Sequence, residues 1–432
     1  MRFPSIQELY AVFKQHAVIS TDSRKIIPGS IFFALKGESF DGNRFAEAAL
    51  KQGAAYSVID NEEYYKGEHF ILVKDSLAAL QELAKHHRQQ FKIPFLGITG
   101  SNGKTTTKEL IKAVLSTKYK VLATEGNLNN HIGVPLTLLA ITQETQIAII
   151  EMGANHVGEI KALCQIAKPD HGLITNIGKA HIGEFGSFEK IIEAKSELYD
   201  HLKATNGKAF VCADNGLLTE RSEGMDRVTY GSSEKNYCSC KLVGADPFLK
   251  ISFGAEAITT KLIGRYNYEN ATAAICIGKY FEIDIKLMKN SIEKYTPSNN
   301  RSQVIKTTYN TLILDAYNAN PSSMRVAIEN FSEMEGNSKW LIVGDMLELG
   351  KYEMEEHKNI LELIKDKKFQ NVILVGDKFQ RSQSEMKSEY MHFKTADELT
   401  SFLKTGTRIA NGSLVLIKGS RGIKLEKAVE FL

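Results

Sequence analysis

The chain has 432 residues, which at roughly 150 residues per domain predicts two or three domains. Hydrophobic residues make up 43% and charged residues 24%, which excludes disordered and fibrous classes, and 54 basic against 51 acidic residues predict no nucleic-acid-binding surface. The longest uncharged apolar run (132–141) is about half of the ~20 residues of a membrane helix, and neither a signal-peptide pattern nor a disulfide pattern is present, so we expect a cytoplasmic protein without membrane insertion.

The first part of the chain, residues 1–90, has the pattern of a small α/β domain. Strand-like runs at 30–35 and 56–59 surround a helical run at 45–52. A helix-like stretch at 76–90 follows, and then Pro94, which predicts a hinge.

From Phe95 onward the rhythm becomes strand, turn and helix. Apolar runs at 95–98, 146–150 and 172–177 are typical of strands buried on both faces of a parallel sheet. A linker is predicted at 296–300. A second series of strands follows, at 311–314, 340–343, 371–375 and 413–417.

These patterns predict an α/β fold with three domains. We expect a small α/β domain over 1–90 and a central α/β domain over 91–300. The remaining residues, 301–432, are expected to form a doubly wound, Rossmann-like C-terminal domain.

The sharpest motif is GITGSNGKTT at residues 97–106. It follows an apolar strand and opens a helix, which is the setting that a phosphate loop requires. Backbone N–H groups and the helix N-terminus would hold phosphates, Lys104 would reach the terminal phosphates, and Thr105 would ligate Mg²⁺. Ile98 stands where the strict pattern has glycine, so a plain glycine turn is the alternative interpretation.

Glu151 ends the apolar run 146–150, and carboxyl ends of strands face the ligand crevice of an open α/β sheet. A carboxylate there can bind magnesium. The alternative is an acidic residue that stabilises the next helix N-terminus.

The helix predicted over 187–202 carries a lysine on its apolar face. At 100° per residue Lys195 lies between Ile192 and Tyr199. Burial would lower the pKa of its amine, and a neutral amine can capture carbon dioxide as a carbamate, which is a carboxylate-like metal ligand. The alternative is a side chain that extends along its stem to the surface.

His181 follows the strand-like run 172–177 within a glycine-containing loop. Its place near a strand end predicts a metal ligand or a phosphate contact. Without the neighbouring motifs it would be read as a surface residue.

Several motifs together carry a resemblance that runs nearly end to end. They are TDSR at 21–24, Pro28-Gly29, 37–43, 99–107, GNLNN at 126–130, 133–135, EMGA at 151–154, 176–186, GRYNYEN at 264–270, Arg301, DAYNANP at 315–321 and KGSR at 418–421. In these motifs the chain resembles the Mur ligases of bacterial cell-wall synthesis. The segment 315–321 resembles the member of that family that adds a dipeptide.

The resemblance implies a role for each matching residue. Lys104, Glu151, His181, Lys195 and Arg301 would be catalytic. ATP would be bound by Thr99, Gly100, Ser101, Asn102, Gly103, Lys104 and Thr105, with Asn267 and Asn270 at adenine, Arg301 at the γ-phosphate and Asp315 at the ribose. Thr105 and Glu151 would hold one magnesium ion, and His181 with a carbamylated Lys195 a second. Substrate would be bound by Ser23, Arg24, Lys36, Asp41 and Gly42 at its uridine diphosphate end, and by Asn130, Asn318 and Asn320.

The implied activity is that of an ATP-dependent amide ligase. It would add D-alanyl-D-alanine to UDP-N-acetylmuramoyl-tripeptide through an acyl phosphate, as a monomer. Alternatives are a Mur-type ligase adding a single amino acid, a ligase like folylpolyglutamate synthase, or a nucleotide-gated binding protein. The sequence does not identify the third residue of the tripeptide as diaminopimelate or lysine.

Two positions depart from the family pattern. Tyr266 stands where the family often has histidine, and Asn300-Arg301-Ser302 replaces a more usual Gly-Arg-Leu. Neither removes a predicted charge, so we expect altered local contacts rather than lost activity.

Overall fold

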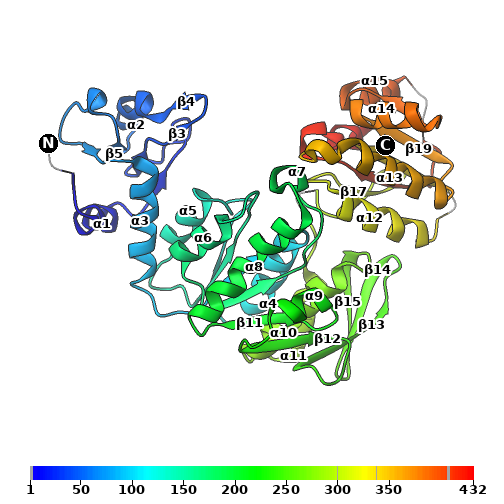
Figure 1. Ribbon diagram of the computed structural model, residues 1–432, viewed down its shortest axis with the longest axis horizontal. Helices are drawn as coiled ribbons and strands as arrows, with labels where there is room; N and C mark the ends of the chain where they lie inside the picture. Colours follow the sequence, from blue (N-terminus) through cyan, green and yellow to red (C-terminus); the bar gives the residue numbers. More distant parts are fainter. Residues whose placement is uncertain (1–2, 299, 337, 406–408) are drawn as a thin grey trace.

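The structure is a computed structural model that describes residues 3–298, 300–336, 338–405 and 409–432. The predicted three-domain α/β architecture is confirmed: the central domain lies between the N-terminal and C-terminal domains along the longest axis of the molecule (Figure 1). Asn299, within the predicted linker, lies outside the described residues. The domain limits proposed above remain a prediction.

The N-terminal domain is built on a parallel four-stranded sheet of order β1-β2-β5-β6, with a small β3-β4 hairpin beside it. Its elements are α1 (Ile6–Gln15), β1 (Ile19–Ser20), β2 (Ile31–Phe33), β3 (Lys36–Gly37), β4 (Phe40–Asp41), η1 (Gly42–Phe45), α2 (Ala46–Lys51), β5 (Tyr56–Ile59), η2 (Glu62–Tyr64), β6 (Phe70–Leu72) and α3 (Ser76–Arg88).

The short strand β2 is apolar at every position because helices cover both faces of this sheet. Ile31 and Phe33 belong to the cluster that contains Leu80 and Leu83 of α3, whereas Phe32 packs with Ala46 and Ala49 of α2. Helix α3 also packs on the central domain and so joins the two bodies (Figure 1).

The central domain contains a nine-stranded sheet of order β15-β14-β13-β12-β11-β10-β7-β9-β8. Its elements are β7 (Phe95–Thr99), α4 (Lys104–Leu115), β8 (Val121–Ala123), α5 (Gly133–Leu139), β9 (Ile147–Glu151), α6 (Glu159–Ala167), β10 (His171–Ile174), α7 (Ile182–Phe185), α8 (Phe188–Ala204), β11 (Lys208–Cys212), α9 (Gly216–Arg221), β12 (Arg227–Gly231), β13 (Cys238–Gly244), β14 (Phe248–Phe253), β15 (Glu256–Ile263), α10 (Asn267–Tyr280) and α11 (Ile285–Lys294).

The order of the parallel strands creates a crevice at β7. The chain leaves β7 for β8 and β9 on one side and then crosses to β10 on the other. Such a change of direction opens a crevice beyond the carboxyl ends of the strands. The predicted phosphate loop follows β7, and Glu151 ends β9, so both reach this crevice.

The far edge of this sheet was not predicted. Strands β13, β14 and β15 pair antiparallel, and residues alternate between buried and more exposed positions along most of β15 and in the first half of β13. Alternation of this kind is typical of a sheet with one solvated face and lacks the continuous apolar runs that marked the parallel strands.

The C-terminal domain has a six-stranded sheet of order β16-β17-β21-β18-β19-β20, parallel except for β16. Its elements are β16 (Gln303–Lys306), β17 (Thr311–Asp315), α12 (Pro321–Glu333), β18 (Lys339–Gly344), η3 (Gly350–Tyr352), α13 (Glu353–Asp366), β19 (Asn371–Val375), α14 (Asp377–Met386), β20 (Met391–Phe393), α15 (Ala396–Lys404), β21 (Leu414–Lys418), η4 (Arg421–Ile423) and η5 (Leu425–Phe431). Separate apolar clusters on its two faces confirm the doubly wound arrangement.

Two further features concern the chain as a whole. All five cysteines, Cys164, Cys212, Cys238, Cys240 and Cys276, are buried free thiols. Among the residues that the structure describes, no helix is both long and apolar enough to cross a membrane.

Candidate active site

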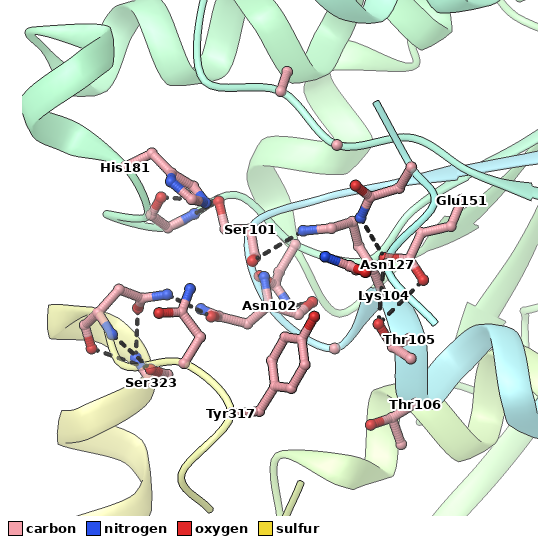
Figure 2. Close-up of a pocket in the computed structure, with 18 of the residues that line it drawn as sticks. Ser101, Asn102, Lys104, Thr105, Thr106, Asn127, Glu151, His181, Tyr317 and Ser323 are labelled. Atoms are coloured by element: carbon pink, nitrogen blue, oxygen red, sulfur yellow. Dashed lines mark hydrogen bonds between the residues drawn. The ribbon is translucent and has the colours of Figure 1, made fainter. Parts of the chain in front are cut away.

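A cleft of about 890 Å³ lies at the carboxyl ends of the central strands and extends to the C-terminal domain. Figure 2 shows its inner part, with the loop after β7 at the centre and the start of α12 opposite. Predicted residues that line it are Ser101, Asn102, Gly103, Lys104, Thr105, Asn130, Glu151, His181, Asn267, Asn270, Arg301, Asp315, Asn318 and Asn320.

The loop after β7 is fastened to the segment after β10. The backbone N–H groups of Ser101 and Asn102 donate to the carbonyl and the side-chain oxygen of Asn176, at 2.9 and 3.0 Å. The Ser101 hydroxyl donates to Gly178 O at 2.9 Å. Gly100 has φ +138°, and a Cβ there would collide with the Thr175 hydroxyl. The loop is therefore held in one shape, and glycine is required at 100.

Two other residues of the predicted nucleotide site support this loop. Thr99, the last residue of β7, is buried and donates from its hydroxyl to Met152 O at 2.8 Å. Gly103 precedes α4 with φ +79°, and a Cβ there would lie 2.6 Å from Asn270 Oδ1. The segment that contains Met152 and the helix that contains Asn270 therefore both lie against the loop.

Lys104 is the first residue of α4, and its side chain folds back over the loop. Its Nζ donates to Gly100 O at 2.6 Å and to Ser101 O at 3.3 Å. Desolvation, with the nearby charge of Arg301, lowers the pKa of Lys104. The ammonium is held by carbonyls alone, so an anion entering the loop would be a better partner.

Glu151 and Thr105 meet at the base of the cleft (Figure 2). The Thr105 hydroxyl lies 3.2 and 3.1 Å from the two carboxylate oxygens of Glu151, which is 1% exposed. Asn129 donates to Glu151 Oε1 at 2.9 Å, and Lys108 Nζ lies 3.6 Å from Oε2. The carboxylate is buried but paired, which is the condition under which a buried charge persists.

The two asparagines predicted at adenine stabilise helix α10 against the loop. Asn267 donates to Ile263 O at 2.8 Å and accepts from Asn270 at 2.8 Å. The Oδ1 of Asn270 accepts from Thr107 at 3.0 Å. Each amide therefore already has partners within the chain.

The C-terminal domain contributes a cation over an aromatic ring. The guanidinium of Arg301 lies 3.6 Å from the centre of the Tyr317 ring, and that of Arg421 lies 5.4 Å from it. Nearby, Lys418 Nζ lies 2.6 Å from Asp315 Oδ2. These contacts orient the charged groups at the mouth of the cleft.

The two departures from the family pattern touch one another. The hydroxyl of Tyr266 lies 2.7 Å from Ser302 Oγ, and burial together with Asp315 raises the pKa of this tyrosine. The hydroxyl of Ser302 thus gives a partly buried tyrosine a polar partner.

The three predicted substrate asparagines also act within the chain. Asn130 accepts the backbone N–H of Gly133 at 2.9 Å. Asn318 accepts the N–H of Ala319, and Asn320 caps α12 through Ser323. The Nδ2 of Asn320 also donates to Asn102 Oδ1 at 2.8 Å, which joins the phosphate loop to the C-terminal domain.

His181 makes a contact across the domain boundary. Its Nδ1 lies 2.7 Å from Glu348 Oε2 and 3.8 Å from Glu184 Oε2. The nearby His181 ring lowers the pKa of Glu348, whereas burial, with the charge of Glu348 beside it, raises the pKa of Glu184.

Lys195 lies on the buried face of α8, as its spacing predicts. It is 1% exposed, so its side chain does not extend to the surface. Its Nζ donates to Ala154 O at 3.1 Å, and Ala154 borders the cleft. Burial, with the charge of Lys104, lowers the pKa of Lys195 to about 7.

Comparison with known proteins identifies the family. Residues 16–88 match the catalytic domain of the Mur ligase family, 98–278 its middle domain and 300–421 its glutamate ligase domain. The chain is 38% identical over 427 residues, 96% of its length and 92% of the relative's, to UDP-N-acetylmuramoyl-tripeptide–D-alanyl-D-alanine ligase of Bacillus subtilis strain 168. The chain belongs to the Mur ligase family. The predicted membership is thereby confirmed.

Solved structures of Mur ligases share the whole architecture. MurF from Acinetobacter baumannii superposes with a TM-score of 0.87 at 29% identity, covering 99% of this chain and 98% of the other. MurF from Thermotoga maritima, solved in complex with ADP, has a TM-score of 0.82 at 27% identity, covering 96% and 97%.

One predicted group of this Mur ligase lies apart from the cleft. Ser23, Arg24, Lys36, Asp41 and Gly42 are all in the N-terminal domain, and none of them lines the cleft. Arg24 pairs with Asp22 at 2.8 Å, and Lys36 pairs with Asp60 at 2.9 Å. The structure therefore does not bring the predicted uridine diphosphate site to the phosphate loop.

Sequence reasoning assigned no role to several residues in or beneath the cleft. Lys108 is buried one helical turn after Lys104, and Glu348 lines the cleft four residues after the end of β18. The places of Lys108 and Glu348 in the sequence could have marked them as candidate site residues. Tyr317 and Lys418 stood inside quoted motifs, but their partners Arg301 and Asp315 become apparent only in the fold.

Proposed function

We propose that this chain joins D-alanyl-D-alanine to UDP-N-acetylmuramoyl-tripeptide at the expense of ATP, in the synthesis of peptidoglycan precursors. The observation that carries this proposal is one cleft lined both by the phosphate loop of the central domain and by Arg301, Asp315 and Asn320 of the C-terminal domain. A reaction of nucleotide, acceptor and incoming dipeptide needs groups from more than one domain around one reacting centre.

ATP would lie across the phosphate loop. The ammonium group of Lys104 would exchange its contacts with the loop carbonyls for contacts with the phosphates. Arg301 would face the phosphates from the other side. Asn267 and Asn270 would border the adenine, and Asp315 the ribose. The Thermotoga maritima relative was solved in complex with ADP, which supports nucleotide binding by this chain.

The residues at the base of the cleft fit a magnesium ion. The buried oxygens of Glu151 and Thr105 lie within 3.2 Å of one another and are hard donors of the kind that Mg²⁺ prefers. A bound Mg²⁺ would withdraw charge from the phosphates and so ease attack on the γ-phosphorus. Lys108 and Asn129 would hold the Glu151 carboxylate in this orientation.

A second magnesium ion is proposed at His181 and Lys195. Among the described residues, no group of three or more His, Cys, Asp and Glu is arranged to hold a metal. A carbamate on Lys195 would add the missing anionic oxygens. A lysine whose pKa is about 7 has a large neutral fraction at neutral pH, which is the form that captures carbon dioxide.

Activation of the acceptor is the chemical task. A carboxylate is a poor electrophile, so its oxygen would first attack the γ-phosphate to give an acyl phosphate and ADP. The dipeptide amine would then attack the carbonyl carbon, and phosphate would leave. Lys104 and Arg301 would stabilise charge in the first step, and Asn318 and Asn320 would border the acceptor or dipeptide.

The N-terminal residues Ser23, Arg24, Lys36, Asp41 and Gly42 would hold the uridine diphosphate end. A long substrate can span from this domain to the cleft, with Asn130 along its path. We further propose domain limits at 90 and 300, a monomer, and a cytoplasmic location where ATP is available.

A product assay tests this function. The purified chain receives ATP, Mg²⁺, D-alanyl-D-alanine and either the diaminopimelate or the lysine form of the tripeptide substrate, and products are identified by mass. We expect dipeptide addition with at least one tripeptide, together with ADP release that requires both other substrates. Addition of a single amino acid or glutamate instead would support a different ligase, and ATP hydrolysis independent of both substrates would contradict ligation.

A further inference from the structure

Arg421 is a cation of the cleft that has no role in the reaction as described above. It follows β21 as the first residue of η4, and it lines the cleft from the C-terminal domain. The other charged residues that this domain contributes to the cleft are already engaged. Lys418 pairs with Asp315, and Glu348 contacts the central domain. Arg301 is the proposed partner of the γ-phosphate.

The guanidinium of Arg421 lacks an anionic partner within the part of the chain that the structure describes. It forms no ion pair there, and its side chain donates no hydrogen bond to a described residue. Its contact is with the face of the Tyr317 ring, 5.4 Å from the ring centre. The five N–H donors are thus available to a ligand, and their planar arrangement matches the two oxygens of a carboxylate.

The neighbouring cation also has a donor that needs a ligand. The Nε of Arg301 is buried and has no hydrogen-bond partner among the described residues, and its guanidinium lies 3.6 Å from the centre of the same Tyr317 ring. A buried donor without an acceptor costs free energy. Two like charges on one ring also repel each other, and bound anions would remove that repulsion. The pair therefore indicates a site for two anionic groups.

The turn that carries Arg421 is held by the residue before it. Ser420 is buried, and its backbone N–H donates to Asp345 O at 3.2 Å. Its hydroxyl donates to Ala319 O at 3.4 Å. Ala319 follows Asn318, which is proposed above to border the acceptor or the dipeptide. The turn and the loop that bears Asn318 thus form one surface of the cleft.

The two guanidinium groups lie at a separation that a dipeptide can span. Because they lie 3.6 and 5.4 Å from the centre of one ring, their carbons are at most 9.0 Å apart. An extended chain covers at most about 3.6 Å per residue, so a dipeptide is about 7 Å long. With its carboxylate at Arg421, its amine would reach the acyl phosphate whose phosphoryl group Arg301 binds.

We propose that Arg421 binds the carboxylate of the incoming dipeptide and so selects a substrate that ends in a free acid. This inference rests on the proposed function for the identity of the dipeptide. Tyr317 would hold the two cations at fixed places relative to each other. The consequence is that the dipeptide is recognised by the charge at one end while its amine reacts at the other.

Two variants at this position separate charge from shape. Arg421→Met removes the charge, whereas Arg421→Lys keeps the charge and removes the planar set of donors. Because Arg421 is exposed, both variants should keep the melting temperature of the wild type. Arg325→Met is the matched control, because Arg325 is a half-exposed cation of α12 that pairs with Glu329 at 3.8 Å and does not line the cleft.

The first measurement is equilibrium dialysis of labelled D-alanyl-D-alanine and of its neutral amide, D-alanyl-D-alaninamide. The full chain is supplied with Mg²⁺, a non-hydrolysable ATP analogue and the tripeptide substrate. Charge-assisted hydrogen bonds correspond to about a tenfold to hundredfold change in Kd, so we expect the wild type to prefer the acid by that factor. Arg421→Met should bind the acid and the amide equally, and Arg421→Lys should keep part of the preference.

The second measurement is the KM for each substrate during ligation. Arg421→Met should raise the KM for the dipeptide by the same factor and leave the KM for ATP and for the uridine nucleotide substrate unchanged. A raised KM for ATP or for the uridine nucleotide substrate instead would assign Arg421 to that ligand and overturn the inference.

Three results of the binding experiment would also overturn it. They are a wild type that does not prefer the acid, an unchanged preference in Arg421→Met, and an equal loss of preference in Arg325→Met. If the wild type prefers the acid but does not ligate it, the proposed function is refuted and the carboxylate site stands.

Discussion

Two regions proposed to bind phosphate groups differ in how their lysines are held. Lys104 in the cleft is half-buried among carbonyls, and burial lowers its pKa. Lys36 in the N-terminal domain is 50% exposed, and its hydrogen bond with Asp60 raises its pKa. Lys104 is placed to stabilise charge that develops during the reaction, whereas Lys36 can only contribute to binding. The comparison predicts different kinetic effects for the two.

Lys104→Ala should have the largest effect. Removal of one charge-stabilising donor costs about 3 kcal/mol or more of transition-state stabilisation, so we expect at least a 100-fold loss in kcat for ligation with no loss of the folded state. ADP release and the melting temperature measure these two quantities. Lys112→Ala, on the same helix, is the control; a variant at 104 that keeps a tenth of the normal rate would contradict the phosphate-loop role.

Lys195→Arg should also be inactive, although it keeps the positive charge. Guanidinium stays protonated and forms no carbamate. We expect bicarbonate to raise the activity of carbon-dioxide-depleted wild type but not of the variant. Formate should restore part of the rate of Lys195→Ala by filling the vacated position. Full activity of the arginine variant would exclude a carbamate.

Lys36→Ala tests the other region. Loss of one charge-assisted hydrogen bond costs about 1.5–3 kcal/mol, so we expect the KM for the uridine nucleotide substrate to rise roughly tenfold to a hundredfold. The KM for ATP and kcat at saturation should stay unchanged. Lys66→Ala, which removes another exposed lysine paired with a carboxylate in this domain, should change neither constant. A lower kcat in Lys36→Ala would contradict the prediction that Lys36 contributes to substrate binding and not to the chemical step.

The pH dependence of stability provides a smaller effect. In the absence of carbon dioxide, unfolding moves the pKa of Lys195 from about 7 to its ordinary value of 10.5. Between these values the unfolded chain binds more protons, so the free energy of unfolding rises with pH, by at most about 1.4 kcal/mol per unit. We expect the free energy of unfolding in urea to increase more between pH 7 and pH 9 for the wild type than for Lys195→Met. If the difference between the two proteins stayed the same at both pH values, the amine of Lys195 would be in contact with water.

The smallest expected effect concerns Tyr266 and Ser302. Their hydrogen bond predicts a coupling of about 0.5–1.5 kcal/mol in a double-mutant cycle of Tyr266→Phe with Ser302→Ala. The measured quantity is the free energy of unfolding in urea. Tyr268→Phe, whose hydroxyl bonds to Cys240 O instead, should show no coupling with Ser302→Ala.

The sequence predicted those features that depend on neighbours along the chain. Continuous apolar runs located the parallel strands, and helical periodicity located Lys195 on the buried face of α8. Pairings across long separations could not be predicted this way. Glu348 and His181 lie in loops of different domains, after β18 and β10, and only the fold brings them together. The hydrogen bond between Tyr266 and Ser302 likewise joins residues 36 positions apart.

The burial of every cysteine has a practical consequence for measuring domain motion. All five native thiols are buried, so maleimide dyes reach them slowly, and burial also raises the pKa of Cys164 and Cys212 to about 12. Cysteines introduced at Lys51 and Asp397, whose side chains are 75% and 73% exposed, would therefore take up maleimide dyes ahead of the native thiols. Energy transfer between two such dyes would follow the separation of the outer domains during turnover, in a chain that retains all its natural cysteines.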